Sequence, residues 1–89
     1  MEKKLQVVER SQEEVNIEVD EKKQPVILLL RNLANGDRFF LCEDGTPDFL
    51  VSYTVMHQKG NYTFVEGSYG RASSTYFKSF SNVVKIIEE

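Results

Sequence analysis

The 89-residue sequence has little of what metal centres and disulfide frameworks require, since it contains one cysteine and one histidine. The single cysteine, Cys42, excludes an intramolecular disulfide and a cysteine-based zinc site. The single histidine, His57, has no carboxylate near it at the spacing of a metal site. The sequence therefore predicts no metal site and no cofactor.

Long apolar runs are also missing. The longest run, residues 26–30, is too short to cross a membrane. The N-terminal residues lack the apolar segment of a secretory signal. We therefore expect a soluble, cytoplasmic protein without membrane contact.

Neither sign of charge dominates, because 11 Lys and Arg residues stand against 14 Asp and Glu residues, for a net charge of −3. This balance argues against attachment to nucleic acid by bulk electrostatics, and it is too small for an acidic mimic of DNA. With 40% hydrophobic residues, the chain has the composition of one small globular domain over residues 1–89. A domain of this size has marginal stability, which favours a homo-oligomer.

The sequence does contain short apolar segments separated by turns. The expected strands cover residues 5–9, 15–19, 26–30, 37–42, 49–57, 62–66, 72–77 and 83–87, the first being a weak signal. Residues 26–30 and 37–42 have apolar side chains at odd and even positions alike, which predicts strands buried on both faces. Residues 49–57 place Phe49, Val51, Tyr53 and Val55 on one face.

The turns between these segments are marked by glycine, proline and asparagine. They are expected at residues 21–25, 35–36, 43–48, 59–61 and 67–70, with Asn35-Gly36 the strongest signal. Of the eight segments, the first is a weak signal and two have a helical alternative, so we expect six or seven short antiparallel strands. With such turns, they predict an all-β fold, either a small barrel or a sandwich.

Two segments leave a short helix open as an alternative. A capping box begins at Ser11, but the apolar residues at 15–19 repeat at every second position, which favours a strand over residues 11–20. Residues 81–89 end in two glutamates, which would lie at the unfavourable end of a helix dipole. We expect strands in both places.

A longer pattern begins at Val26 and continues as Leu30-x-x-Leu33-x-x-Gly36-x-x-Phe39. It is followed by Phe49, Val51, Gly70, Phe77, Val83 and Ile86. This pattern resembles small β-barrel proteins of phage and prophage genomes. The resemblance implies a β-barrel fold and an origin in a phage or mobile element. Its positions are core and turn residues, so it implies no functional residue.

Residues that could carry catalysis are sparse. Cys42 and His57 form the only candidate thiol–imidazole pair, but Cys42 follows three apolar residues and is expected to be an inert core residue. His57 is expected to face solvent near a strand end. The acidic loop 43–48 lacks the ligand spacing and flanking helices of a calcium-binding loop. The sequence therefore predicts a protein that is not an enzyme.

The stretch from residue 60 to residue 77 is the most distinctive, with three tyrosines, two phenylalanines, three glycines and one arginine. It predicts a hairpin around residues 67–70 in which Tyr76 lies across from Tyr62 and Phe64. The simplest interpretation is that these aromatics fill the core. They could instead form a contact surface for a protein, or a stacking surface for unpaired nucleic acid. The candidate binding residues are Lys59, Tyr62, Tyr69, Arg71 and Tyr76.

These observations favour a small non-enzymatic module that binds another protein of unknown identity. If the chain belongs to a phage or mobile element, inhibition or modulation of a host or defence protein is the expected role. Two alternatives stay open, a β-barrel that binds single-stranded nucleic acid and a structural or assembly subunit.

Overall fold

The computed structural model of the chain describes residues 4–10, 13–67 and 74–87. These residues form eight strands and one short 3-10 helix, η1. The strands are β1 (Lys4–Arg10), β2 (Glu13–Val19), β3 (Leu28–Leu29), β4 (Arg38–Glu43), β5 (Thr46–Lys59), β6 (Tyr62–Gly67), β7 (Thr75–Lys78) and β8 (Asn82–Ile87); η1 spans Leu30–Asn32.

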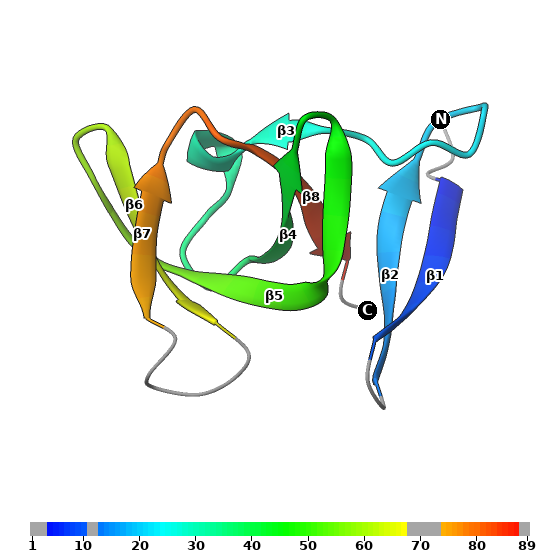
Figure 1. Cartoon of the computed structure of the whole chain (residues 1–89), viewed down its shortest axis with the longest axis horizontal. Coiled ribbons are helices and arrows are strands. Elements are labelled where there is room, and N and C mark those ends of the chain that lie inside the picture. Colours follow the sequence, from blue (N-terminus) through cyan, green and yellow to red (C-terminus); the bar gives the residue numbers. More distant parts are fainter. Residues whose placement is uncertain (1–3, 11–12, 68–73, 88–89) are drawn as a thin grey trace.

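The strands form one antiparallel sheet in the order β1-β2-β8-β4-β5-β6-β7, with β3 paired to β8. Figure 1 shows the sheet curled, with the β1–β2 hairpin at one end and the β6–β7 hairpin at the other. Among the described residues, β1 pairs only with β2 and β7 pairs only with β6, so hydrogen bonds do not close the sheet. The all-β prediction is confirmed, with eight strands rather than six or seven.

Both segments with a helical alternative contain strands, β2 at residues 13–19 and β8 at residues 82–87. The expected strands are therefore confirmed and the helical alternative is not found in the described residues, while residues 11–12 and 88–89 lie outside them. No helix in the described part of the chain is long and apolar enough to cross a membrane.

The central strands β4 and β8 are buried on both faces. In β4 the neighbouring residues Phe39 and Phe40 are both fully buried, and in β8 so are Val83 and Val84. Since neighbouring residues of a strand point to opposite sides, hydrophobic cores lie on both sides of this pair. The prediction for residues 37–42 is therefore confirmed.

The two cores draw on different parts of the chain. The first core, on the side of the β1–β2 hairpin, contains Val8, Val15, Ile17, Val19, Phe40, Cys42, Val84 and Ile86, with Phe49 packed against them. The second core contains Leu30, Leu33, Phe39, Val55, Val65 and Val83, with Leu28, Leu41, Tyr53 and Phe77 partly buried around them.

The prediction of a two-sided buried strand over residues 26–30 is wrong. Only Leu28–Leu29 form a strand, Ile27 is exposed, and Leu30 begins η1. The Leu30 N–H donates to the Ser81 carbonyl, in register with the β3–β8 pair, but the Arg31 N–H donates to the Ser79 carbonyl, which skips a residue and ends the ladder as η1 begins. The segment therefore crosses the sheet and contributes Leu30 to the second core.

Strand β5 starts earlier and is less regular than the sequence indicated. Asp44 and Gly45, both with positive φ (51° and 78°), make a tight turn in place of a six-residue loop. Farther along, Leu41 of β4 alone faces residues 48–51 of β5. Figure 1 shows β5 running beside β4 and then bending toward β6.

The irregular pairing divides the residues of β5 between the cores. Phe49 packs edge-on against Phe40 in the first core, with ring centroids 5.0 Å apart. Tyr53 stacks on Phe39 beside the second core, at 5.6 Å. The prediction that Phe49 and Tyr53 share one continuous face is therefore wrong, because the extra residues of β5 change which side a residue faces.

The two-core arrangement predicts that Val83→Ala and Val84→Ala both destabilise the protein. Each removes methyl groups from a fully buried site, which costs about 1.5–3 kcal/mol of unfolding free energy. Urea denaturation of both variants and of Val7→Ala, at an exposed position of β1, measures the difference. A neutral result for either Val83 or Val84 would show that one face of β8 is not covered.

Candidate binding surface

The antiparallel pairing predicted in the aromatic stretch is present between β6 and β7, while residues 68–70 of the expected turn lie outside the described residues. Phe64 lies directly opposite Tyr76, and Tyr62 lies opposite Lys78. Because directly opposed residues of an antiparallel pair point to the same side, these four side chains share one face. The predicted position of Tyr76 is thus confirmed.

The aromatic side chains on this face do not fill a core, in contrast to the simplest expectation. Tyr62, Phe64 and Tyr76 are 44%, 41% and 58% exposed. Strand β6 alternates, with Thr63 and Val65 buried beneath the sheet. The sheet is covered on only one side here, so period-2 alternation leaves the rings on the open side.

The exposed rings touch one another across the strands. Tyr62 and Tyr76 meet edge to face with centroids 5.4 Å apart, and Phe64 lies 5.8 Å from Tyr76. His57 of β5 extends the row, with its ring 5.5 Å from that of Phe64. These contacts give one continuous aromatic surface over three strands.

A β-bulge in β5 determines which residues join this surface. Val55 pairs with Val65, but His57, not Met56, pairs with Phe64. An uninterrupted ladder would bring Met56 opposite Phe64 and Gln58 opposite Tyr62. The extra residue instead places His57 and Lys59 on the face with the rings.

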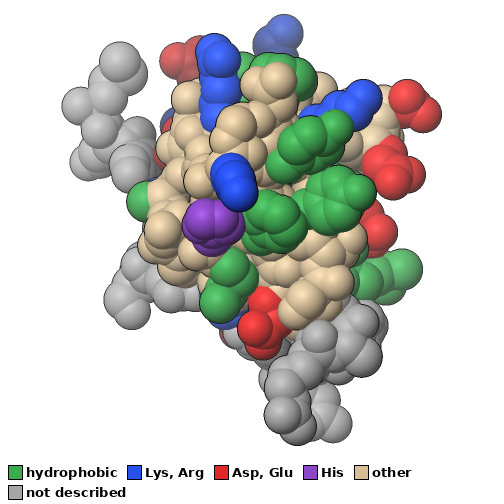
Figure 2. Space-filling view, turned by 90° about the vertical axis from the view of Figure 1, so that its left-hand side faces the viewer, with side chains coloured by type: hydrophobic (Ala, Val, Ile, Leu, Met, Phe, Trp, Pro, Cys, Tyr) green, Lys and Arg blue, Asp and Glu red, His purple; other side chains and the backbone are tan. Residues whose placement is uncertain are grey.

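We define the aromatic face as His57, Lys59, Tyr62, Phe64, Tyr76 and Lys78. One cross-strand row is Lys59–Tyr62–Lys78 and the next is His57–Phe64–Tyr76. A shallow hollow of about 410 Å³ is lined by Lys59 and the three exposed rings. Figure 2 shows this side of the molecule, where hydrophobic side chains gather beside a basic side chain and the histidine.

The aromatic face is locally basic although the whole chain is acidic. It contains two lysines, and the one described carboxylate on β6 and β7, that of Glu66, is only partly exposed beyond the His57 row. Acidic residues gather elsewhere, in the 43–48 region and in the β1–β2 hairpin with its following turn. The charge of the face is therefore complementary to an acidic ligand.

Buried polar contacts hold the face from behind. The hydroxyl groups of Thr63 and Ser79 form a buried hydrogen bond of 3.0 Å, and the Ser79 N–H donates to the Asn61 carbonyl. The side-chain amide of Gln58 donates to the carbonyl of Leu33 at 2.7 Å. The first two bonds tie β6 to the residue after β7, and the third ties the end of β5 to the residue after η1.

The structure describes three of the five predicted binding residues. Lys59, Tyr62 and Tyr76 lie together on the aromatic face, whereas Tyr69 and Arg71 lie outside the described residues. The candidate set omitted Phe64 and Lys78, which hairpin register and alternation could have identified. It also omitted His57, whose place depends on the bulge.

Cys42 and His57 do not form a thiol–imidazole pair. Cys42 is buried in the first core, opposite Pro47, whereas His57 is exposed on the aromatic face. Burial raises the pKa of the Cys42 thiol, which disfavours the nucleophilic thiolate. Among the residues that the structure describes, no cluster of three or more His, Cys, Asp or Glu residues could hold a metal ion.

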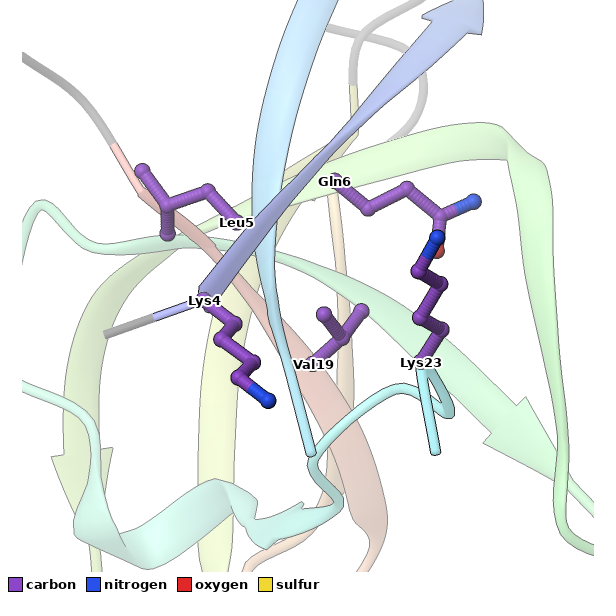
Figure 3. Close-up of a pocket in the computed structure, with 5 residues that line it drawn as sticks. All are labelled: Lys4, Leu5, Gln6, Val19 and Lys23. Atoms are coloured by element: carbon purple, nitrogen blue, oxygen red, sulfur yellow. The ribbon is translucent and has the colours of Figure 1, made fainter. Parts of the chain in front are cut away.

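A second hollow of about 400 Å³ lies beside β1, lined by Lys4, Leu5, Gln6, Val19 and Lys23. In Figure 3, Leu5 and Gln6 leave β1 on opposite sides, and Val19 lies between the two lysines. This described lining has no aromatic ring and no pair of polar groups bonded to each other. It is less organised for binding than the aromatic face.

Comparisons with known proteins do not add to this geometry. No family model, curated protein or solved structure matches the chain. The resemblance to phage and prophage β-barrels stays a prediction, and function is argued from the aromatic face.

The burial of Cys42 predicts slow reaction with thiol reagents. We expect Ellman's reagent at pH 8 to modify the folded protein roughly a hundredfold or more slowly than the protein in denaturant, because reaction requires the first core to open. N-Acetylcysteine provides the reference rate. Equal rates in the folded and unfolded protein would contradict the burial of this thiol.

Proposed function

We propose that this protein is a small non-enzymatic binding module whose aromatic face contacts another protein. The observation that supports this proposal is the contact of three half-exposed rings on the paired strands β6 and β7. Aromatic side chains dominate the energetics of protein interfaces, and contiguous exposed patches are uncommon on proteins without partners. The separation of buried Cys42 from His57 favours binding over nucleophilic catalysis.

The size of the aromatic face limits the free energy of binding that it can provide. Covering three half-exposed rings removes roughly 300 Å² of surface from water, equivalent to about 7 kcal/mol. Association costs about 4–15 kcal/mol in lost freedom. The rings alone therefore do not support a tight complex, and contacts at their border must contribute.

Single-stranded nucleic acid is the second candidate, favoured by the Lys59–Tyr62–Lys78 row. Two phosphate contacts give a log–log salt slope of only about −1.4 for a single strand. Tyr62 and Tyr76 also stand at 86° to each other instead of presenting parallel ring faces to successive bases. Both points favour a protein partner over nucleic acid.

Several finer expectations belong to this proposal. A phage or mobile-element accessory protein that inhibits a host or defence protein is one role for such a module, and a cytoplasmic location stays a separate prediction. Homo-oligomerisation and a role as an assembly subunit also stay predictions, which sedimentation at several concentrations distinguishes.

Replacing two rings tests the proposed surface. The double variant Tyr62→Thr/Tyr76→Thr removes the rings while keeping residues that favour strands. We expect retention of partner proteins from a lysate of the source cell to fall about tenfold or more, since both rings are central contacts. Tagged wild-type protein and Val7→Ala serve as controls, and circular dichroism checks that each variant is folded.

The same experiment distinguishes the candidates. Nuclease treatment should leave the retained proteins bound if the partner is a protein. Release by nuclease would support the nucleic-acid candidate instead. Unchanged retention by the folded double variant would remove the aromatic face as the contact surface.

A further inference from the structure

We infer that the partner of the aromatic face is an extended acidic segment that pairs with the outer edge of β7 as an added antiparallel strand. This inference rests on the proposed function and names the chemistry of the partner. Tyr76 and Lys78 select the segment, with an apolar residue facing Tyr76 and an acidic residue facing Lys78.

The hydrogen-bond pattern between β6 and β7 leaves backbone groups of β7 free on its outer edge. The Ser79 N–H donates to the Asn61 carbonyl, and bonded pairs alternate along an antiparallel ladder. Phe77 is therefore in a bonded pair with Thr63, while the backbone N–H and C=O of Tyr76 point to the side away from β6. No strand of the described residues pairs with that side of β7.

The edge of β7 that a partner strand can use ends at Lys78. The carbonyl of Lys78 already accepts the N–H of Ser81 in the turn that leads to β8. A partner strand can therefore exchange both of its hydrogen bonds with Tyr76 but does not continue past Lys78. A segment of few residues suits this site, and its side chains must provide the selectivity.

The aromatic face provides that selectivity. Tyr76 and Lys78 point to the same side as Tyr62 and Phe64. Every second residue of an added strand therefore lies beside Tyr76 or Lys78 on that side. The first row ends in Lys78 and the second ends in Tyr76. In an antiparallel partner, the acidic residue comes first and the apolar residue follows two positions later.

Charge selects the acidic segment over a basic one. Lys59 and Lys78 lie in one row, whereas the described carboxylate on this side of β6, that of Glu66, lies two residues beyond Phe64 and away from that row. Like charges directly across a strand pair are unfavourable. Backbone pairing separates this partner from nucleic acid, which has no peptide groups to bond with Tyr76.

The test is an NMR titration of the full-length ¹⁵N-labelled protein with capped ten-residue peptides. The first peptide places glutamate two positions before tyrosine in a threonine-rich strand. The second reverses that order, the third replaces glutamate with lysine, and the fourth repeats the first with an N-methylated backbone. A ten-nucleotide oligothymidine is the nucleic-acid probe.

We expect the first peptide to shift the backbone amides of Tyr76 and Lys78 and to bind about two- to fivefold more tightly than the second or third. The N-methylated peptide should lose these amide shifts because it lacks the donors of the added strand. Lys78→Glu should reverse the charge preference, so that the lysine peptide binds better than the glutamate peptide. A reversed preference cannot come from general loss of folding.

Three results would overturn the inference. They are equal binding of the acidic and basic peptides, an unchanged preference in Lys78→Glu, and tighter binding of oligothymidine than of every peptide. If peptide selectivity fails while the Tyr62→Thr/Tyr76→Thr variant still loses its protein partners, the proposed function stands without edge pairing. If both fail, the aromatic face is not the binding surface.

Discussion

Burial of the β4–β8 pair on both faces is the constraint from which the rest of the structure follows. Phe39 and Phe40 point to opposite sides of one strand, and both are inaccessible to water. Covering both sides uses the β1–β2 hairpin on one side and η1 with β5 and β6 on the other. In a chain of 89 residues, little remains to cover the ends of the sheet.

The aromatic face is a consequence of that distribution. Strands β6 and β7 contribute Val65 and Phe77 to the second core, so only one side of this hairpin is buried. Their other side presents rings and lysines that the central strands do not need. The bulge at Met56 adds His57 and Lys59 to the same side, which joins the end of β5 to the surface.

Local features of the sequence predicted much of this fold. The alternation of Tyr62 and Phe64 with Thr63 and Val65 predicted two faces of one strand, and the turn residues predicted the hairpins. Alternation does not reveal which face of a strand another element covers, so the sequence alone favours core positions for these rings. Which face of a strand is buried depends on packing against segments that are distant in the chain.

Irregular pairing was the other feature that the sequence did not reveal. The bulge at Met56 and the extra residues 48–51 of β5 exist only relative to the strands beside them. The apolar run 26–30 had the composition of a buried strand, yet Leu30 and its neighbour bond to the segment before β8. In each case tertiary hydrogen bonding outweighed local preference.

Hydroxyl-radical footprinting of the free protein, read by mass spectrometry, tests the central claim most directly. The account predicts that Phe64 and Tyr76 are oxidised rapidly, while Phe39 and Phe40 are protected until the protein unfolds. Protection of Phe64 and Tyr76 equal to that of Phe39 in the monomer would contradict it, because the rings would then belong to a core.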